Sequence, residues 1–157
     1  MNSKTQKITK VRIKRVTSTG ELTQAFAIRM RVFVKEQKVP AEIELDRDDM
    51  RAVHFLATLA SGKAVGTARL VRRHGRAKIG RMAVLKMYRR KGAGTKLLQC
   101  AIAAAKRLRA RQIYLHAQVP VIGFYQLMGF RSVGRVFHEA GIPHRKMILK
   151  EIHRGQI

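Results

Sequence analysis

The chain has 157 residues, with 34 lysines and arginines against 9 aspartates and glutamates, which gives a formal net charge of +25. That length fits one compact domain, and no apolar run approaches the ~18 residues of a membrane span. The single cysteine excludes an internal disulfide, no Cys/His cluster has zinc-ligand spacing, and the N-terminus lacks the apolar core of a signal peptide. We therefore expect a cytoplasmic, metal-free protein that does not bind membranes.

The distribution of charge is more informative than its total. A net charge of this size predicts attraction to polyanions, such as nucleic acid or a phosphate-rich small molecule, without choosing among them. The acidic residues cluster, and six of the 9 fall in one stretch of 14 residues: Glu36, Glu42, Glu44, Asp46, Asp48 and Asp49. Such a stretch suits a site that holds a cationic amine beside an anionic cofactor. It equally suits a solvated acidic loop that pairs with nearby arginines.

The first regular pattern follows a loose polar start at 1–9. Residues 10–16 alternate between apolar and basic side chains, which is typical of a half-buried strand. Ser18 and Glu21 have the spacing of a capping box, and apolar residues at helical spacing follow to about residue 34. Pro40 and the acidic stretch then form a connection between this helix and the next strand.

The remaining patterns predict a sheet whose first strands are joined by short turns and lie next to one another. They indicate strands at 54–59, 64–71 and 78–84, a basic glycine-bearing segment at 86–94 that opens a long helix, a strand at 112–117, a short helix at 121–128, and closing strands at 131–137 and 145–149. No internal repeat or linker interrupts them. The sum is an α/β (α+β) fold, with a mixed, mostly antiparallel central sheet flanked by helices, in a single domain over 1–157.

A glycine loop between the third strand and the long helix carries the main functional signal. Residues 89–95 have the sequence Arg-Arg-Lys-Gly-Ala-Gly-Thr. Gly92 and Gly94 lack a Cβ, so the backbone can approach a ligand and turn its N–H groups toward it, while the helix start adds unpaired donors. The loop matches neither the Walker A nor the dinucleotide-binding pattern. A pyrophosphate fits such a cradle; the alternative is a glycine-containing helix start without a ligand.

At these residues the sequence resembles the GNAT family of N-acetyltransferases. The cofactor loop of that family has glutamine or arginine, then glycine three residues later, then glycine or alanine two residues after that, and Arg89, Gly92 and Gly94 match it. A second family signature, an aromatic-tyrosine pair ahead of Gly-Phe, stands at 124–130. Both motifs occur in the expected order along the chain. The resemblance therefore implies the GNAT fold and an acetyltransferase activity.

Other segments resemble one branch of that family, the ElaA-like proteins. They are the stretch 32–37 followed by Pro40 and the acidic loop that reaches His54, and the segment Glu-Ala-Gly-Ile-Pro-His at 139–144. The resemblance covers roughly 10–152, which is nearly the whole chain.

The resemblance implies an acetyl-CoA site and no metal. Backbone groups of three consecutive strand residues would pair with the pantetheine arm where two strands splay apart, and the amides of 90–95 would hold the pyrophosphate. Basic side chains at the rim of the loop would add countercharge. The complete set expected to contact the cofactor is Met82, Ala83, Val84, Arg89, Arg90, Lys91, Gly92, Ala93, Gly94, Thr95, Phe124 and Tyr125.

The implied reaction is direct attack of an amine on the thioester carbonyl. Tyr125 would lie near the cofactor sulfur, where its hydroxyl can protonate the leaving thiolate. The alternative role of Tyr125 is to pack the sheet edge with its amphipathic ring. Both interpretations place the side chain close to the cofactor loop.

The general base is less clear, because the sequence departs from the family there. Many members carry a glutamate on the strand before the glycine loop, whereas 77–84 contains no carboxylate here. The base must therefore come from Glu36, Glu44 or Asp46 in the acidic stretch, or from His116 on the strand before Tyr125. A histidine at the end of a strand is more often a hydrogen-bonded structural residue than a base.

A second class of function stays open at this stage. The net charge exceeds what the phosphates of one cofactor require, so the chain could be a basic nucleic-acid-binding domain that reuses the acetyltransferase scaffold without catalysis. Against this, no strand alternates basic and aromatic residues as RNA-recognition strands do. We therefore expect, first, an acetyltransferase that acts on a small-molecule amine. A homodimer is compatible with the sequence.

Overall fold

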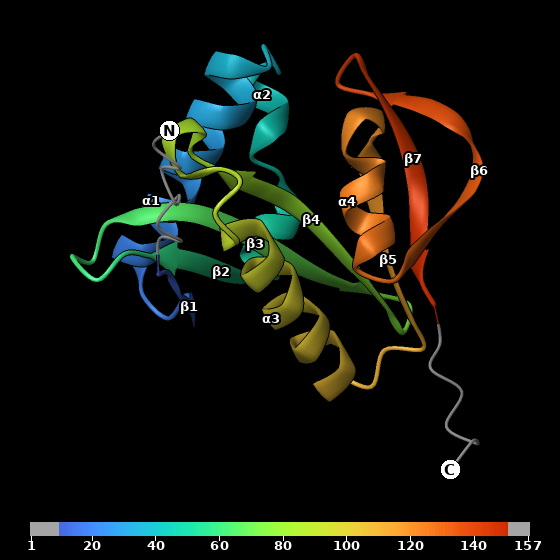
Figure 1. Ribbon diagram of the computed structural model, residues 1–157, viewed down its shortest axis with the longest axis horizontal. Coiled ribbons are helices and arrows are strands. Elements are labelled where there is room, and N and C mark those ends of the chain that lie inside the picture. Colours follow the sequence, from blue (N-terminus) through green and yellow to red (C-terminus); the bar gives the residue numbers. More distant parts are fainter. Residues whose placement is uncertain (1–9, 151–157) are drawn as a thin grey trace, which may run out of the picture.

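The computed structural model describes residues 10–150 of the chain. Residues 1–9, which the sequence predicts as a loose start, lie outside that range, as do 151–157. The described part is a single sheet with helices on both faces (Figure 1). None of the helices in this part is long and apolar enough to cross a membrane.

Seven strands form one mixed sheet in the order β1-β2-β3-β4-β5-β7-β6. Every neighbouring pair is antiparallel except β4 and β5, which run parallel. The strands are β1 (Arg12–Arg15), β2 (Val53–Thr58), β3 (Ala64–Arg73), β4 (Arg76–Val84), β5 (Gln112–Gln118), β6 (Phe130–Glu139) and β7 (Ile142–Leu149). The predicted mixed, mostly antiparallel sheet is confirmed.

Helices occupy most of the connections, and the first one starts where the sequence predicts. The Ser18 hydroxyl accepts a hydrogen bond from the Glu21 amide (3.2 Å) and caps this helix. The α-helices are α1 (Thr19–Arg29), α2 (Ala41–Glu44), α3 (Ala93–Arg107) and α4 (Ile122–Leu127); η1 (Met30–Glu36) is a π-helix, and η2 (Arg47–Met50), η3 (Lys86–Tyr88) and η4 (Val119–Val121) are 3₁₀ turns. The acidic connection is thus more regular than predicted, because Pro40 and Asp46 each start a helical turn.

β4 and β5 pair only over their first halves. Their parallel register runs from Arg76 opposite Gln112 to Ile79 opposite Leu115, and it stops there. Beyond this point a bulge in β4 places Arg81 at a φ of +49°, while β5 keeps its pairing with β7. The two strands therefore diverge, as Figure 1 shows. The divergence leaves backbone groups at the centre of the sheet without a strand partner.

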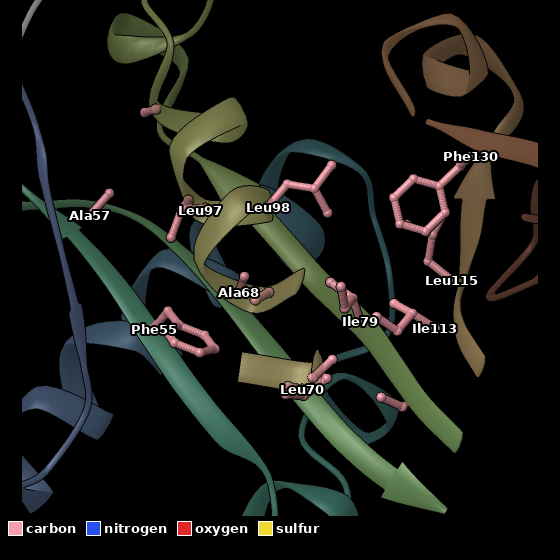
Figure 2. Close-up of a cluster of buried hydrophobic side chains, with 14 of the residues drawn as sticks. Phe55, Ala57, Ala68, Leu70, Ile79, Leu97, Leu98, Ile113, Leu115 and Phe130 are labelled. Carbon is pink, nitrogen blue, oxygen red and sulfur yellow. The ribbon is translucent and has the colours of Figure 1, made fainter. Parts of the chain in front are cut away.

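The main core lies between α3 and one face of the sheet. Figure 2 shows Leu97 and Leu98 of α3 near Phe55 and Ala68 of the sheet, and all four are buried. Full burial of each leucine contributes about 1.5–3 kcal/mol to folding. Leu56, the neighbour of Phe55, points to the opposite face and packs in a smaller cluster under α1. The sheet is therefore covered by α3 on one face and α1 on the other.

A buried arginine joins α1 to the acidic stretch. The Arg29 side chain is 1% exposed and donates to Asp49 (Nη1 to Oδ1, 2.6 Å) and to Glu44 (Nε to Oε1, 3.0 Å). Arg69 of β3 donates to the same Asp49 carboxylate (2.8 Å) and to both Asp46 oxygens (2.6 and 2.9 Å). Charge pairs thus hold the acidic stretch against the α1 face of the sheet.

We expect Arg29→Met to lower the free energy of unfolding by about 3–5 kcal/mol, because it leaves the buried Glu44 and Asp49 carboxylates without their shared cation. Methionine retains much of the apolar stem, so the loss reports on the charge. Chemical denaturation followed by circular dichroism measures the change. Arg31→Met is the control, because Arg31 is exposed two residues further along the same helical segment. Equal stability of the two variants would contradict the structural role of the buried pairs.

Candidate active site

A cleft of about 630 Å³ opens where β4 and β5 diverge. Such a volume is within the range of about 300–1,000 Å³ that is usual for small-molecule sites. Val32 of η1 and Gln37, the residue that ends it, line one end, and Phe124 and Tyr125 of α4 line another. The Gln37 side chain accepts a hydrogen bond from Gln118 of β5 (2.8 Å), which ties the π-helix to the sheet across the cleft. The cleft therefore extends between the two faces of the sheet.

The β4 wall of the cleft presents backbone groups. The Leu85 amide donates to the Val65 carbonyl of β3 (2.9 Å), and successive strand residues direct their backbone polar groups to opposite edges. Met82 and Val84 therefore face β5 and the cleft, whereas Ala83 faces β3. Of the three residues expected to pair with a pantetheine arm, Met82 and Val84 have the orientation for it. Ala83 does not, because its backbone is turned toward the neighbouring strand.

The glycine loop leaves a run of amides without an internal acceptor. Gly92 is the N-cap of α3 at a φ of +89°, which glycine adopts without steric cost, and no side chain caps the helix. Among residues 10–150, no acceptor is found for the amides from Arg90 to Thr95, and the first amide to bond is that of Lys96, to the Gly92 carbonyl (3.1 Å). A helix start of this kind offers free donors and a partial positive charge, so it can bind an anion.

The basic side chains around the loop differ in their contacts. Arg89 donates to both oxygens of Glu36 (3.1 and 2.9 Å) and to the Val84 carbonyl (2.8 Å). This pairing compensates the Glu36 charge at the end of η1, where the helix dipole disfavours a carboxylate. Arg89 is therefore a link between η1 and the loop rather than a mobile countercharge. Arg90, which is exposed, and Lys91 follow it on the loop itself.

Two adjacent aromatic residues of α4 lie beside the loop. The rings of Phe124 and Tyr125 are 5.0 Å apart in an edge-to-face arrangement, and Phe124 Cζ is 3.8 Å from the place that a Cβ on Gly94 would occupy. The Tyr125 hydroxyl contacts the Met82 sulfur (3.7 Å), which is a weak acceptor. Burial raises the pKa of Tyr125 to about 12. The hydroxyl is therefore protonated at neutral pH, and no strong acceptor binds it.

His116 of β5 belongs to a polar cluster on another wall of the cleft. Its Nδ1 donates to Glu139 Oε1 (2.5 Å), because an ionised carboxylate only accepts. The hydrogen bond from His116 lowers the pKa of Glu139, and burial acts against it. The other Glu139 oxygen lies 4.0 Å from Nε2 of His144, yet no three such groups in residues 10–150 could hold a metal ion. The contact fixes the His116 tautomer and leaves Nε2 as its basic nitrogen.

Two of the other predicted bases are bound to arginines. Glu44 is buried with Arg29 Nε at 3.0 Å and Arg81 Nε at 3.3 Å, and burial raises its pKa although these cations oppose the shift. Asp46 accepts two hydrogen bonds from Arg69. Burial acts to raise the pKa of Asp46, but these hydrogen bonds and the nearby arginine charges lower it overall. The structure therefore corresponds to the second interpretation of the acidic stretch, in which it pairs with arginines. The Glu44 pair is buried rather than solvated.

Two cleft residues were not identified from the sequence. Glu139 lies within the segment 139–144 already noted, but its contact with His116 depends on how β6 and β7 fold back beside β5. Lys78 lies between the buried residues Ala77 and Ile79. Strand alternation indicates that Lys78 points away from the core, but not that a cleft lies there.

The comparison with known proteins decides the family. The geometry above is a cleft between splayed strands, bounded by a helix start with free amides. A model of the acetyltransferase (GNAT) domain matches residues 14–151, which is nearly the whole chain. This chain belongs to the GNAT acetyltransferase family. The resemblance identified from the glycine loop is thus confirmed.

Individual GNAT relatives agree with this assignment. The uncharacterized N-acetyltransferase YjcF of Bacillus subtilis (strain 168) is 36% identical over 129 residues, which cover 82% of this chain and 91% of that protein. The Escherichia coli (strain K12) protein ElaA is 30% identical over 133 residues, 81% of this chain and 86% of that protein. The crystal structure of Escherichia coli ElaA has a TM-score of 0.80 at 26% identity and covers 90% of this chain and 100% of that chain. The resemblance to the ElaA branch is therefore confirmed as well.

A more distant GNAT structure contains the expected cofactor. The GNAT family acetyltransferase from Elizabethkingia anophelis, with acetyl-CoA bound, has a TM-score of 0.65 at 18% identity and covers 88% of this chain and 94% of that chain. At that identity the likeness concerns the fold alone. The predicted GNAT fold is confirmed, and the family includes members that bind acetyl-CoA.

Proposed function

We propose that this GNAT protein is an N-acetyltransferase that moves the acetyl group of acetyl-CoA to a primary amine. The observation that carries the proposal is the run of amides from Arg90 to Thr95, which have no described acceptor and start a helix beside the cleft. Acetyl-CoA, as co-substrate, supplies the activated acetyl group and carries a pyrophosphate, which is the anion that such amides bind.

The cofactor contacts follow from the orientation of the backbone. In this proposal the pyrophosphate binds the amides at the start of α3, and Arg90 and Lys91 add positive charge at its rim. The pantetheine arm lies along β4 and bonds to Met82 and Val84. The Val84 carbonyl already accepts from Arg89 Nε (2.8 Å), so its amide is the group that remains for the arm. This path directs the thioester toward Tyr125.

The proposed chemistry is direct attack of a neutral amine on the thioester carbonyl. The new C–N bond forms in a tetrahedral intermediate, and its collapse breaks the C–S bond and releases the thiolate of CoA. Tyr125 donates a hydrogen bond, and then its proton, to that thiolate, while the nitrogen of the new amide gives up one proton; the return of a proton to the tyrosinate completes the balance, with CoA leaving as the thiol. The burial that raises the pKa of Tyr125 to about 12 also makes a thiolate released there more basic, which favours its protonation.

His116 is the base that the geometry favours among the predicted candidates. Glu36, Glu44 and Asp46 all bind arginine side chains, and a carboxylate paired in this way is a weak proton acceptor. His116 lines the cleft with its Nδ1 bound to Glu139, so in this proposal Nε2 takes the proton of the amine and the Glu139 carboxylate stabilises the resulting imidazolium.

Gly94→Ala tests the cofactor cradle. A Cβ at residue 94 would lie 3.8 Å from Phe124, an ordinary contact, and alanine favours a helix over glycine by about 1 kcal/mol. We expect the variant to be at least as stable as the wild type. It should nevertheless bind acetyl-CoA about tenfold more weakly or worse, a loss of about 1.4 kcal/mol, because the methyl group occupies space over the amides. Isothermal titration calorimetry measures the affinity.

Gly20→Ala is the matched control for this variant. Gly20 is likewise the second residue of a helix, α1, and a Cβ there meets nothing within 4 Å. Its stability should rise to a similar degree while the affinity for acetyl-CoA stays at the wild-type value. If Gly94→Ala also bound acetyl-CoA as tightly as the wild type, the amides at the start of α3 would not be the cofactor site.

Tyr125→Phe tests the general acid. Among residues 10–150 the hydroxyl has one hydrogen-bond contact, the Met82 sulfur, so its removal should leave the fold and the acetyl-CoA affinity unchanged. We expect kcat to fall at least tenfold, near the low end of the ~10²–10⁴ that general acids contribute. An assay of thiol release measures kcat, with Tyr114→Phe as the control on the neighbouring strand β5. A kcat equal to the wild-type value would assign the protonation of the thiolate to water.

His116→Ala tests the general base. We expect kcat to fall by ~10²-fold or more, and imidazole added to the buffer to restore part of it by taking the place of the missing ring. His138→Ala is the matched control, because His138 is exposed beside Glu139 on β6. Full activity of His116→Ala would exclude the histidine as base, whereas a loss without rescue would indicate a role in holding the strands together.

A further inference from the structure

One side of the cleft is a positively charged face of the sheet. Ala77 and Ile79 are buried in the core under α3, so Lys78 between them projects to the opposite face, which α1 covers in part. Arg69 and Arg81 lie on that face too, because their guanidinium groups contact the acidic stretch there. Lys78, Arg69 and Arg81 all line the cleft.

The carboxylates of the acidic stretch near this face are already compensated, and Glu139 across the cleft is hydrogen-bonded to His116. Four carboxylates of the acidic stretch, Glu44, Asp46, Asp48 and Asp49, form one network of ion pairs, and five arginines bind them: Arg29, Arg51, Arg69, Arg73 and Arg81. The network thus has one more arginine than it has carboxylates. The acidic stretch therefore has no carboxylate to spare in this network for a cationic ligand.

Lys78 is a cation that this network leaves uncompensated. It lies partly buried in the cleft, and no hydrogen bond or salt bridge to a side chain within residues 10–150 is found for it. Burial lowers the pKa of Lys78. Glu139 opposes this shift, and the nearby Arg69, Arg81 and Arg73 add to it. An anion that entered the cleft would relieve this unfavourable charge, so the site is better suited to an anion than to a cation.

We propose that the Lys78 ammonium group binds an anionic group of the acceptor, a carboxylate or a phosphate. The acceptor is then a small zwitterion that carries its reactive amine and its anion in one molecule. This inference rests on the proposed acetyltransferase function and names the substrate class for the same site.

The positions of the strands limit the size of that molecule. Lys78 stands opposite Tyr114 in the parallel register, and His116 is two residues further along β5. At about 3.3 Å per residue and about 4.8 Å between strands, the backbones at Lys78 and His116 are roughly 8 Å apart. Gly80 is two residues further along β4 on the same cleft wall, level with His116 on β5, and a Cβ there would meet nothing within 4 Å. This open space suits an amino acid or an amino phosphate.

The closing experiment compares ligands that differ only in the anion. The protein, saturated with CoA, is titrated in a calorimeter with glycine, alanine and lysine, with the amide of each amino acid, and with phosphoethanolamine against ethanolamine. We expect at least one anionic ligand to bind about tenfold or more tightly than its neutral counterpart, because only the anion compensates Lys78. The amino acid and phosphoethanolamine arms distinguish a carboxylate from a phosphate.

Lys78→Met should abolish that preference, so that each anionic ligand and its counterpart bind within about twofold of each other. Arg76→Met is the matched control: it removes one positive charge from the same face of the same strand, but Arg76 is exposed and does not line the cleft. It should keep the preference. Gly80→Val is a second variant that retains Lys78 and fills the open space; it should weaken every acceptor at least tenfold while CoA still binds.

The outcomes separate this inference from the function on which it rests. Any of three results would overturn the role of Lys78: the paired ligands bind equally, no anionic ligand binds, or the preference survives in Lys78→Met. Acetyl transfer to the neutral amines in a parallel assay by mass would then leave the proposed function intact. Conversely, if anionic amines bound in the expected pattern but no amine in the panel were acetylated, the transferase function would fail and the anion site would stand.

Discussion

The divergence of β4 and β5 is the constraint on which the rest of the structure depends. The parallel register ends at Ile79 and Leu115, because β4 bulges at Arg81 while β5 stays paired with β7. A continuous sheet would use the backbone groups of Met82 and Val84 for strand pairing. Because the strands part, those groups are free, a cleft of about 630 Å³ crosses the sheet, and the amides of α3 lie at one side of it. The loss of a few ladder hydrogen bonds thus creates the site.

Buried charge pairs keep the cleft open on its other side. An apolar segment packed over the bulge would close the space between the strands, whereas the acidic stretch is held there by directional contacts with Arg29, Arg69 and Arg81. Removing one partner of such a network leaves a buried charge uncompensated, so the geometry is specific. The acidic residues therefore have a positioning role, and on the proposed function the proton acceptor is another cleft residue, His116, whose Nδ1 is bound to Glu139.

The sequence predicts those parts of the fold and site that depend on neighbouring residues. The helix start at Ser18, the glycine cradle at Gly92 and Gly94, and the sheet order of the first strands all follow from local patterns, and the structure contains them. The contact between His116 and Glu139 could not be predicted, because the two residues meet only after β7 pairs with both β5 and β6. The pairing of the acidic stretch was one of two open interpretations, since its arginines come from separate elements.

The positive charge around Lys78 bears on the chemistry as well as on binding. An amine attacks a thioester only in its neutral form, and a bound ammonium group must first lose a proton. Burial lowers the pKa of Lys78, and the field of Arg69, Arg81 and Arg73 adds to this while Glu139 opposes it. On the proposed function, burial and these arginines would act in the same direction on an acceptor amine bound nearby. A site lined by free carboxylates would hold the amine as an ammonium ion and oppose the reaction. On the proposed function, the anion of the acceptor supplies the attraction that its amine, once neutral, cannot supply.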